Sequence, residues 1–315
     1  MAAEKNIADF AVGDHVEGFY IMKTAQSKLA SNGRPFLAAS LMDVTGLIEA
    51  KVWDYAGPIG AGDEGKVVKI RGEISEYRGS KQCGVSVIRL AAENDSYDAS
   101  RLVPTAPIDA DACMAELGRL TGSIADADYR RIAEEMLRRH AEELRRIPAG
   151  KSVHHDGIGG LLMHTANMLR LADFLSKQYA DTVDRSLLLA GTLLHDFAKA
   201  REFRFSSLGL VTEYTVEGEL LGHLVMGAQE VAEVAKSLGV AEEKSVLLQH
   251  MLLSHHGDPQ FGAAVRPAIA ESELLSLIDM LDSRMEIYRK AHLETPAGEF
   301  SQKIFALDKK IYHHE

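Results

Sequence analysis

The stretch LLLAGTLLHDFAKA, residues 187–200, decides how the rest of this chain is interpreted. Eight uncharged residues, five of them leucine, run directly into His195 and Asp196, and Lys199 follows three residues later. Burying an unpaired charge costs several kcal/mol or more, so the His–Asp pair needs partners from elsewhere in the chain. The stretch therefore predicts a buried helix that carries an ionisable pair into the interior.

Helical periodicity continues on both sides of this stretch. Apolar residues recur at i, i+3 and i+4 in segments of 15 or more residues, and Gly239 and Gly257 stand where helix C-caps belong. We expect an all-α bundle over residues 126–315. The predicted helical segments are residues 126–147, 158–179, 183–200, 217–239, 242–257 and 271–290.

The first hundred residues have the two-residue period of strands. Five short runs rich in Val, Ile and aromatic residues are separated by Gly and Asp, which predicts a small closed barrel or sandwich, and an OB-fold matches the size. We therefore divide the chain into an OB-fold domain (1–95), a linker with the first helix (96–125) and the helical domain (126–315). The predicted strands are residues 15–22, 35–43, 46–55, 66–75 and 83–91.

Residues of the metal-ligand type are spread over five consecutive helical segments. A single histidine on an apolar face is more often a core histidine, but that explanation has to be repeated for seven residues here. A shared metal ion satisfies several buried polar groups at once. Imidazole and carboxylate ligands without cysteine suit Mn, Fe, Co, Ni or Zn, which leaves the ion open. The seven residues are His164, His195, Asp196, His223, His255, His256 and Asp279.

The order H…HD…D resembles that of the HD-domain metal-dependent phosphohydrolases. Five segments also resemble, in order, those of the YhaM-type bacterial 3′→5′ exoribonucleases, which join an N-terminal OB-fold to an HD domain. The resemblance covers essentially the whole chain. The segments are HHDGIGGLLMHT (154–165), LLLAGTLLHDFAKA (187–200), VEGELLGHLVMG (216–227), LLSHHGDPQFG (252–262) and IDMLDSRM (278–285).

This resemblance implies a first metal site at His164, His195, Asp196 and Asp279. In family members with two ions, the residue that corresponds to Asp196 bridges them. The second ion would then be bound here by His223, His255 and His256. The cofactor is then one or two divalent ions, Mn²⁺ or Co²⁺ before Fe, Ni or Zn. Met163 departs from the glutamate more common before the first histidine.

The same resemblance assigns Lys199, beside the catalytic Asp196, to stabilising phosphate charge; the alternative is a surface lysine favoured by the helix dipole. His154 and His155 match paired histidines of the family, but whether they contact substrate or are structural stays open, as does the role of His250.

The function implied by the resemblance is a metal-dependent 3′→5′ exonuclease that hydrolyses single-stranded RNA to 5′-mononucleotides, with single-stranded DNA as a second substrate left open. Two alternatives are a phosphohydrolase of small nucleotides and a nucleic-acid-binding regulatory protein with an inactive HD site. The barrel argues against the first, since a mononucleotide needs no strand guide. The full ligand set argues against the second.

The predicted barrel carries a local excess of positive charge. Residues 66–89 contain six basic and two acidic residues. Trp53 and Tyr77 are candidates for base stacking, and Arg71, Arg78 and Lys81 for contacts with the nucleic-acid backbone. The alternative is that the aromatic residues are core and the basic residues only solvated.

Composition limits the remaining classes. The net charge of −11 over 315 residues argues against a surface built for unspecific nucleic-acid binding. The two distant cysteines suit a reducing cytoplasm without disulfides. We find no signal-peptide core and no apolar run of about 18 residues, so we expect a cytoplasmic protein that does not enter a membrane. A homo-oligomer stays open.

Overall fold

The computed structural model describes residues 5–315 except 31, 78, 93, 151–156, 207 and 210. The chain forms two compact units, the first of residues 1–105 and the second of nearly all of residues 106–315. The helix of the predicted 96–125 stretch is α1 (Ala110–Gly122), which packs within the second unit, where its Leu117 and Leu120 join the helical core.

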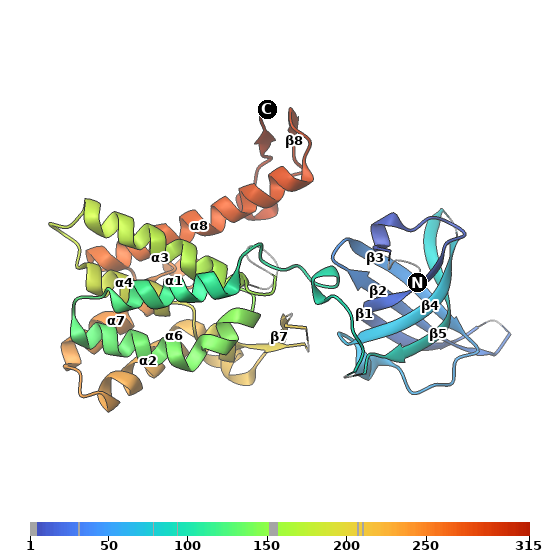
Figure 1. The fold of residues 1–315 in the computed structure, drawn as a ribbon, viewed down its shortest axis with the longest axis horizontal. Coiled ribbons are helices and arrows are strands. Elements are labelled where there is room, and N and C mark those ends of the chain that lie inside the picture. Colours follow the sequence, from blue (N-terminus) through green and yellow to red (C-terminus); the bar gives the residue numbers. More distant parts are fainter. Residues whose placement is uncertain are drawn as a thin grey trace. The chain divides into compact units, whose positions relative to one another are not determined.

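The first unit is a closed barrel in the strand order β1-β2-β3-β5-β4, with β3 and β5 parallel and β4 closing onto β1 (Figure 1). Its core is built by alternation: in β3, Ile48, Ala50 and Val52 point inward, while Trp53 is exposed. The predicted OB-fold is confirmed. The strands are β1 (His15–Leu29), β2 (Pro35–Asp43), β3 (Gly46–Trp53), β4 (Val67–Tyr77) and β5 (Ser80–Leu90).

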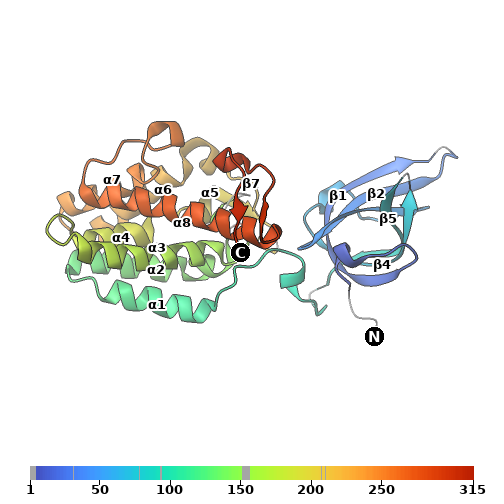
Figure 2. The same ribbon diagram turned by 90° about the horizontal axis from the view of Figure 1, so that it is seen from above.

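The second unit is a helical bundle around one apolar core, as predicted. Figure 2 shows α1, α2 and α3 running side by side, with α8 crossing over the same bundle. The helices are α1 (Ala110–Gly122), α2 (Ala127–Arg146), α3 (Gly160–Gln178), α4 (Arg185–Leu194), α5 (Lys199–Glu202), α6 (Val216–Ser237), α7 (Glu242–Ser254) and α8 (Ala270–Glu294). Within the described residues, no helix is long and apolar enough to cross a membrane.

Two helices end earlier than predicted, and each ends at a pair of predicted metal ligands. The prediction of 15 or more residues is wrong for α4, which has 10 and stops before His195, and for α7, which has 13 and stops before His255. The physical reason lies in the carbonyl groups that a helix end leaves without partners. His195 Nδ1 bonds to Thr192 O and His255 Nδ1 to Leu252 O, each at 2.8 Å, so each histidine satisfies a carbonyl of its own helix.

The second unit was predicted to contain only α-helices, but it also contains strands. It contains two short antiparallel hairpins, β6 (Phe203–Phe205) with β7 (Val211–Tyr214) and β8 (Glu299–Phe300) with β9 (Tyr312–His313). Aromatic pairs hold each together, since the ring centroids of Phe203 and Tyr214 lie 4.9 Å apart and those of Phe300 and Tyr312 5.0 Å apart. Such short strands leave too few residues for a period to be detected.

Candidate metal centre

One group of ligand-type side chains forms where α3 passes the end of α4. His164 lies in α3, and His195 and Asp196 directly follow α4; one ligand atom from each lies within 4.8 Å of the others. Asp279 of α8 adds a second carboxylate, with its Oδ1 at 3.3 Å from His164 Nε2. All four residues that the resemblance assigned to the first metal site are therefore brought together.

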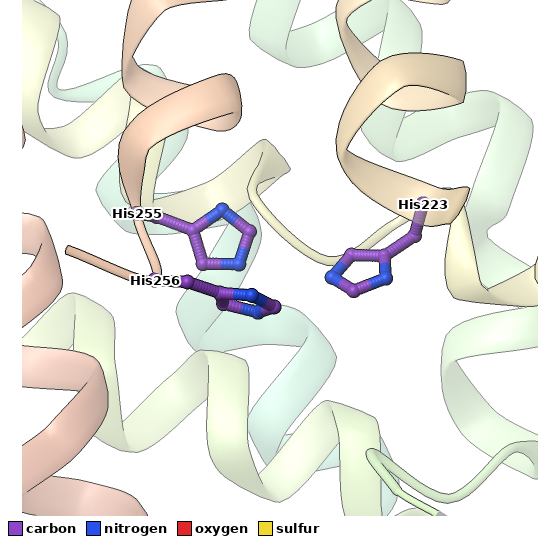
Figure 3. Close-up of side chains that lie close together, drawn as sticks. All are labelled: His223, His255 and His256. Carbon is purple, nitrogen blue, oxygen red and sulfur yellow. The ribbon is translucent and has the colours of Figure 1, made fainter. Parts of the chain in front are cut away.

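A second group forms where α6 meets the end of α7. Ligand atoms of His223, His255 and His256 also lie within 4.8 Å of one another. Figure 3 shows the three rings turned toward one another, His223 from α6 and the other two from the segment that follows α7. This is the trio assigned to the second ion.

Asp196 lies between the two groups and faces both. Its Oδ2 is 3.3 Å from His195 Nε2 and 3.9 Å from His164 Nε2. Its Oδ1 is 3.4 Å from His223 Nε2 and 3.7 Å from His255 Nε2. One carboxylate oxygen is thus directed at each group, which is the arrangement that a bridging ligand requires.

Four of the histidines are held by their other ring nitrogen. Beyond the two carbonyl bonds of His195 and His255, His164 Nδ1 lies 2.7 Å from Asp282 Oδ2, and His223 Nδ1 lies 3.0 Å from Glu202 Oε1. A partner on Nδ1 fixes the ring and leaves Nε2 for the centre, as around metal-binding histidines generally. Sequence reasoning missed Glu202 and Asp282; each lies three residues after a predicted site residue, Lys199 and Asp279, on the same helical face.

The polar atoms at the centre fit a divalent cation. Each is fully buried and has, among the described residues, no hydrogen-bond partner, and leaving such a group without a partner costs about 1–3 kcal/mol. Nitrogen and oxygen donors without sulfur suit a divalent transition metal, which would satisfy all of these atoms together. The atoms are His195 Nε2, Asp196 Oδ1, His223 Nε2, His255 Nε2 and His256 Nδ1.

The charges at the centre shift its acid–base properties. Burial raises the pKa of Asp196, but the charge of Lys199, followed by that of His195, holds it well below its usual range. Burial lowers the pKa of His164, but the hydrogen bonds that its ring donates to Asp279 and Asp282 outweigh burial and raise that pKa to about 9. Asp196 is therefore a carboxylate at neutral pH, ready to act as an anionic ligand.

Lys199 is tied to Asp196. Its Nζ lies 2.7 Å from Asp196 Oδ2 and 2.8 Å from Ala149 O, and although burial lowers the pKa of Lys199, the neighbouring Asp196 raises it. The side chain is largely buried, so it is not a solvated capping lysine. It also lines the cavity beside the metal centre.

His223 depends on a break in its own helix. Gly222 has φ 70° and ψ 162° inside α6, so the regular hydrogen bonding is interrupted there, and the backbone N–H of His223 bonds instead to Glu202 Oε1 at 3.1 Å. A left-handed φ is open to glycine and strained for other residues. Gly222 therefore lets one carboxylate hold both the backbone and the ring of His223.

Replacing Gly222 with alanine is expected to lower the free energy of unfolding by about 1–3 kcal/mol, because the left-handed backbone becomes strained. Urea denaturation of the metal-free protein measures this change. Gly118→Ala in α1 is the matched control, since its new Cβ meets nothing within 4 Å and alanine is favoured in a helix by roughly 0.5–1 kcal/mol. Equal stabilities for the two variants would contradict the role given to Gly222.

The remaining predicted site residues are more scattered. Arg71 is paired with Glu17, and the Lys81 Nζ donates to the backbone carbonyl of Phe10. His250 Nε2 accepts a hydrogen bond from the Ala268 N–H at 3.0 Å, which gives this histidine a structural partner. Three predicted or open residues, namely Arg78, His154 and His155, lie outside the described part of the chain.

A histidine–aspartate pair at a helix end, joined by candidate ligands from four further segments of the chain, is the arrangement of an HD domain, and the HD-domain family model matches residues 161–284. Two curated relatives are named 3′-5′ exoribonuclease YhaM, from Listeria innocua serovar 6a and Listeria welshimeri serovar 6b. Each is 37% identical over 313 residues, which is 99% of this chain and 98% of the relative. The chain belongs to the YhaM family of 3′-5′ exoribonucleases.

Two further similarities are weaker. A helicase family model, TraI_2, matches residues 114–185. The second OB-fold domain of replication protein A from Methanococcus maripaludis aligns with 30% of this chain and 99% of that domain, at 14% identity and a TM-score of 0.23. This score is too low to support a conclusion, and the OB-fold rests on the strand order of the barrel itself.

Proposed function

We propose that this protein is a metal-dependent exonuclease that removes 5′-mononucleotides one at a time from the 3′ end of single-stranded RNA, and also of single-stranded DNA. The observation that carries the proposal is the position of Asp196, with one carboxylate oxygen toward each group of histidines. Family membership supports the direction and the substrate.

The site has the parts that phosphodiester hydrolysis needs. A bound divalent ion supplies Lewis acidity, which lowers the pKa of water and draws charge from the phosphate. The first ion would be held by His164, His195, Asp196 and Asp279, and the second by Asp196 with His223, His255 and His256. We propose Mn²⁺ or Co²⁺, as the family resemblance implies; the His and Asp groups, which contain no cysteine, are compatible with either ion.

Lys199 provides a positive charge beside Asp196, next to the proposed metal ions. Its ammonium is held by Asp196 Oδ2 and Ala149 O, both at under 3 Å, and lines the cavity beside the metal centre. Such a fixed charge stabilises the negative charge that builds up when phosphorus is attacked. Attack in line releases the 3′ oxygen of the preceding nucleotide, so the piece set free carries a 5′-phosphate.

The barrel offers a surface for the RNA strand. Trp53 and Tyr77 are 55% and 53% exposed, and Lys51 Nζ lies 5.6 Å and 5.1 Å from their ring centroids. Phe36 extends the surface, with its ring 4.9 Å from that of Trp53. Exposed rings beside a cation stack unpaired bases with little regard to sequence. We propose that this aromatic surface guides single strands, and that Arg71, neutralised by Glu17, contributes little.

Removing both exposed rings with Trp53→Ala and Tyr77→Ala is expected to raise KM for long RNA strands at least about fivefold, since each stacked base contributes about 1–3 kcal/mol. Cleavage of a dinucleotide should stay unchanged, because a dinucleotide is too short to need the barrel. Tyr179→Ala, at a ring of similar exposure on the helical unit, is the control. An equal loss on long and short substrates would rule out the strand-guide role.

One assay separates this function from its alternatives. Metal-loaded protein is given RNA labelled at its 5′ end, with the 3′ end either free or blocked. Shortening from the free 3′ end alone, with release of 5′-mononucleotides, supports the exonuclease. Hydrolysis of mononucleotides alone supports a small-nucleotide phosphohydrolase, and RNA binding without turnover at full metal loading supports a regulatory protein.

We propose a cytoplasmic location. Cys83 and Cys113 are both buried free thiols, as expected in a reducing compartment. Burial raises the pKa of Cys83 to about 11, so this thiol stays protonated and unreactive.

A further inference from the structure

A cavity of about 500 Å³ adjoins the metal centre, within the range of about 300–1,000 Å³ typical of small-ligand pockets. Lys199, His255 and Asp279 form the wall that it shares with the centre. The cavity is also lined by residues without a part in the metal centre. These include Phe261, Met280 and Arg284, two apolar side chains and one cation.

Phe261 is held beside this cavity by a rigid turn. It ends the short 3₁₀ helix Pro259–Phe261, whose first residues are capped by Asp258, and Gly262 with φ 101° turns the chain away. Asp258 is itself fixed by an ion pair with Arg266 at 3.0 Å. The Phe261 ring is nevertheless 69% exposed. A large ring kept in water by a well-anchored turn is suited to contact a ligand.

Arg284 is the available cation of the cavity. Lys199 is committed to Asp196, and the neighbouring arginines Arg266 and Arg289 are paired with Asp258 and Glu286. Arg284, one helical turn beyond Met280 on α8, has no ion pair or hydrogen bond within the part of the chain that the structure describes. A guanidinium presents its donors as a planar fork that matches phosphate oxygens.

We propose that this cavity binds the 3′-terminal nucleotide of the substrate, with Phe261 stacking on the base and Arg284 binding its 5′-phosphate, which is the phosphate that is attacked at the metal centre. The proposal rests on the proposed exonuclease function. An enzyme that removes one nucleotide at a time needs a place for the departing nucleotide next to the centre that cuts behind it. An apolar ring beside a free cation matches the two ends of a nucleotide, and stacking accepts every base.

Binding of three ligands to the metal-loaded full-length protein tests the two roles separately. The ligands are adenosine 5′-monophosphate, ribose 5-phosphate and adenosine, measured by calorimetry. Phe261→Ala is expected to weaken binding of the nucleotide and of adenosine at least about fivefold, and to leave ribose 5-phosphate unchanged. Arg284→Ala is expected to weaken the two phosphate-containing ligands about tenfold and to leave adenosine unchanged.

Two matched variants serve as controls. Phe305→Ala removes a ring that is 98% exposed, and Arg119→Ala removes an exposed arginine on α1; both should bind all three ligands like the unaltered protein. Metal content and thermal unfolding are measured for each variant, and Phe261→Leu and Arg284→Lys replace any that fails to fold. Phe261→Leu should keep part of the nucleotide affinity, and Arg284→Lys should keep more affinity for phosphate than Arg284→Ala.

The outcomes distinguish this proposal from the one it rests on. If RNA is shortened from its 3′ end but neither variant changes nucleotide binding, the cavity is not the terminal subsite and the exonuclease function stands. If RNA is not shortened under any metal condition, the exonuclease function fails whatever the nucleotide affinities are. If Arg284→Ala weakens binding of ribose 5-phosphate and Phe261→Ala changes no affinity, the cavity binds phosphate alone and the nucleotide assignment is overturned.

Discussion

Replacing Asp196 with alanine is expected to reduce the rate of RNA cleavage by at least about a thousandfold. In other enzymes, removing one hydrogen-bond donor that stabilises the negative charge of the transition state already lowers the rate by about 10²–10³-fold. Asp196 contributes more than that, because its two oxygens face both histidine groups and its Oδ2 also holds Lys199. Single-turnover cleavage of a 3′-labelled RNA measures the loss directly.

The control for this variant is Asp181→Ala, which removes an exposed carboxylate in the turn between α3 and α4. Its activity should equal that of the unaltered protein. RNA binding by Asp196→Ala should be nearly intact, because the aromatic surface belongs to the barrel. If Asp196→Ala keeps more than about one per cent of the activity, the site assignment is wrong. Such a loss would be smaller than the roughly hundredfold loss caused by removing a single hydrogen-bond donor to the transition state.

Glu202→Ala is expected to weaken the binding of one of two metal ions by about 10–100-fold, the usual effect of removing the partner that orients a metal-binding histidine. Glu202 Oε1 accepts from both the backbone N–H and the Nδ1 of His223, so its loss frees the ring and leaves a buried donor unpaired. Titration with a metal indicator, combined with elemental analysis, gives the affinity and number of ions.

Glu217→Ala is the matched control, since Glu217 lies on the same helix as His223 but pairs with Arg201 at the surface. The two-ion arrangement predicts that the ion bound by His164 keeps its affinity in both variants. A single ion per chain in the unaltered protein, or unchanged affinity of both ions in Glu202→Ala, would remove the basis for a second site.

Periodicity in the sequence was enough to predict the barrel, the helical bundle and the helical segments that carry the seven candidate ligands. It could not predict where α4 and α7 end, because leucine continues a helix by its own propensity up to His195 and His255. The helices stop there because each histidine ring competes for a carbonyl of the last turn. That competition depends on ring orientation, which no sequence pattern reports.

The partners of the ligands were also beyond the reach of the sequence. Asp282 lies 118 positions from His164, and only the packing of α8 on α3 brings them to 2.7 Å. In the barrel, the register of β1 with β4 places Glu17 opposite Arg71, which neutralises a residue that looked available for nucleic acid. Local patterns determine which residues face inward, whereas pairing across elements follows from the completed fold.

The convergence of five chain segments on Asp196 has a consequence for the lifetime of the protein. Because the candidate ligands come from α3, α6, α8 and the ends of α4 and α7, a bound ion would link residues that are up to 115 positions apart in the chain. An ion that binds only the folded chain stabilises it by RT ln(1 + [M]/Kd), about 2.7 kcal/mol at a hundredfold excess over Kd. The metal-free chain would unfold more often and be degraded by proteases, so cells short of divalent metal would contain fewer copies of the enzyme. RNA turnover would then depend on the metal supply through protein abundance as well as through catalysis.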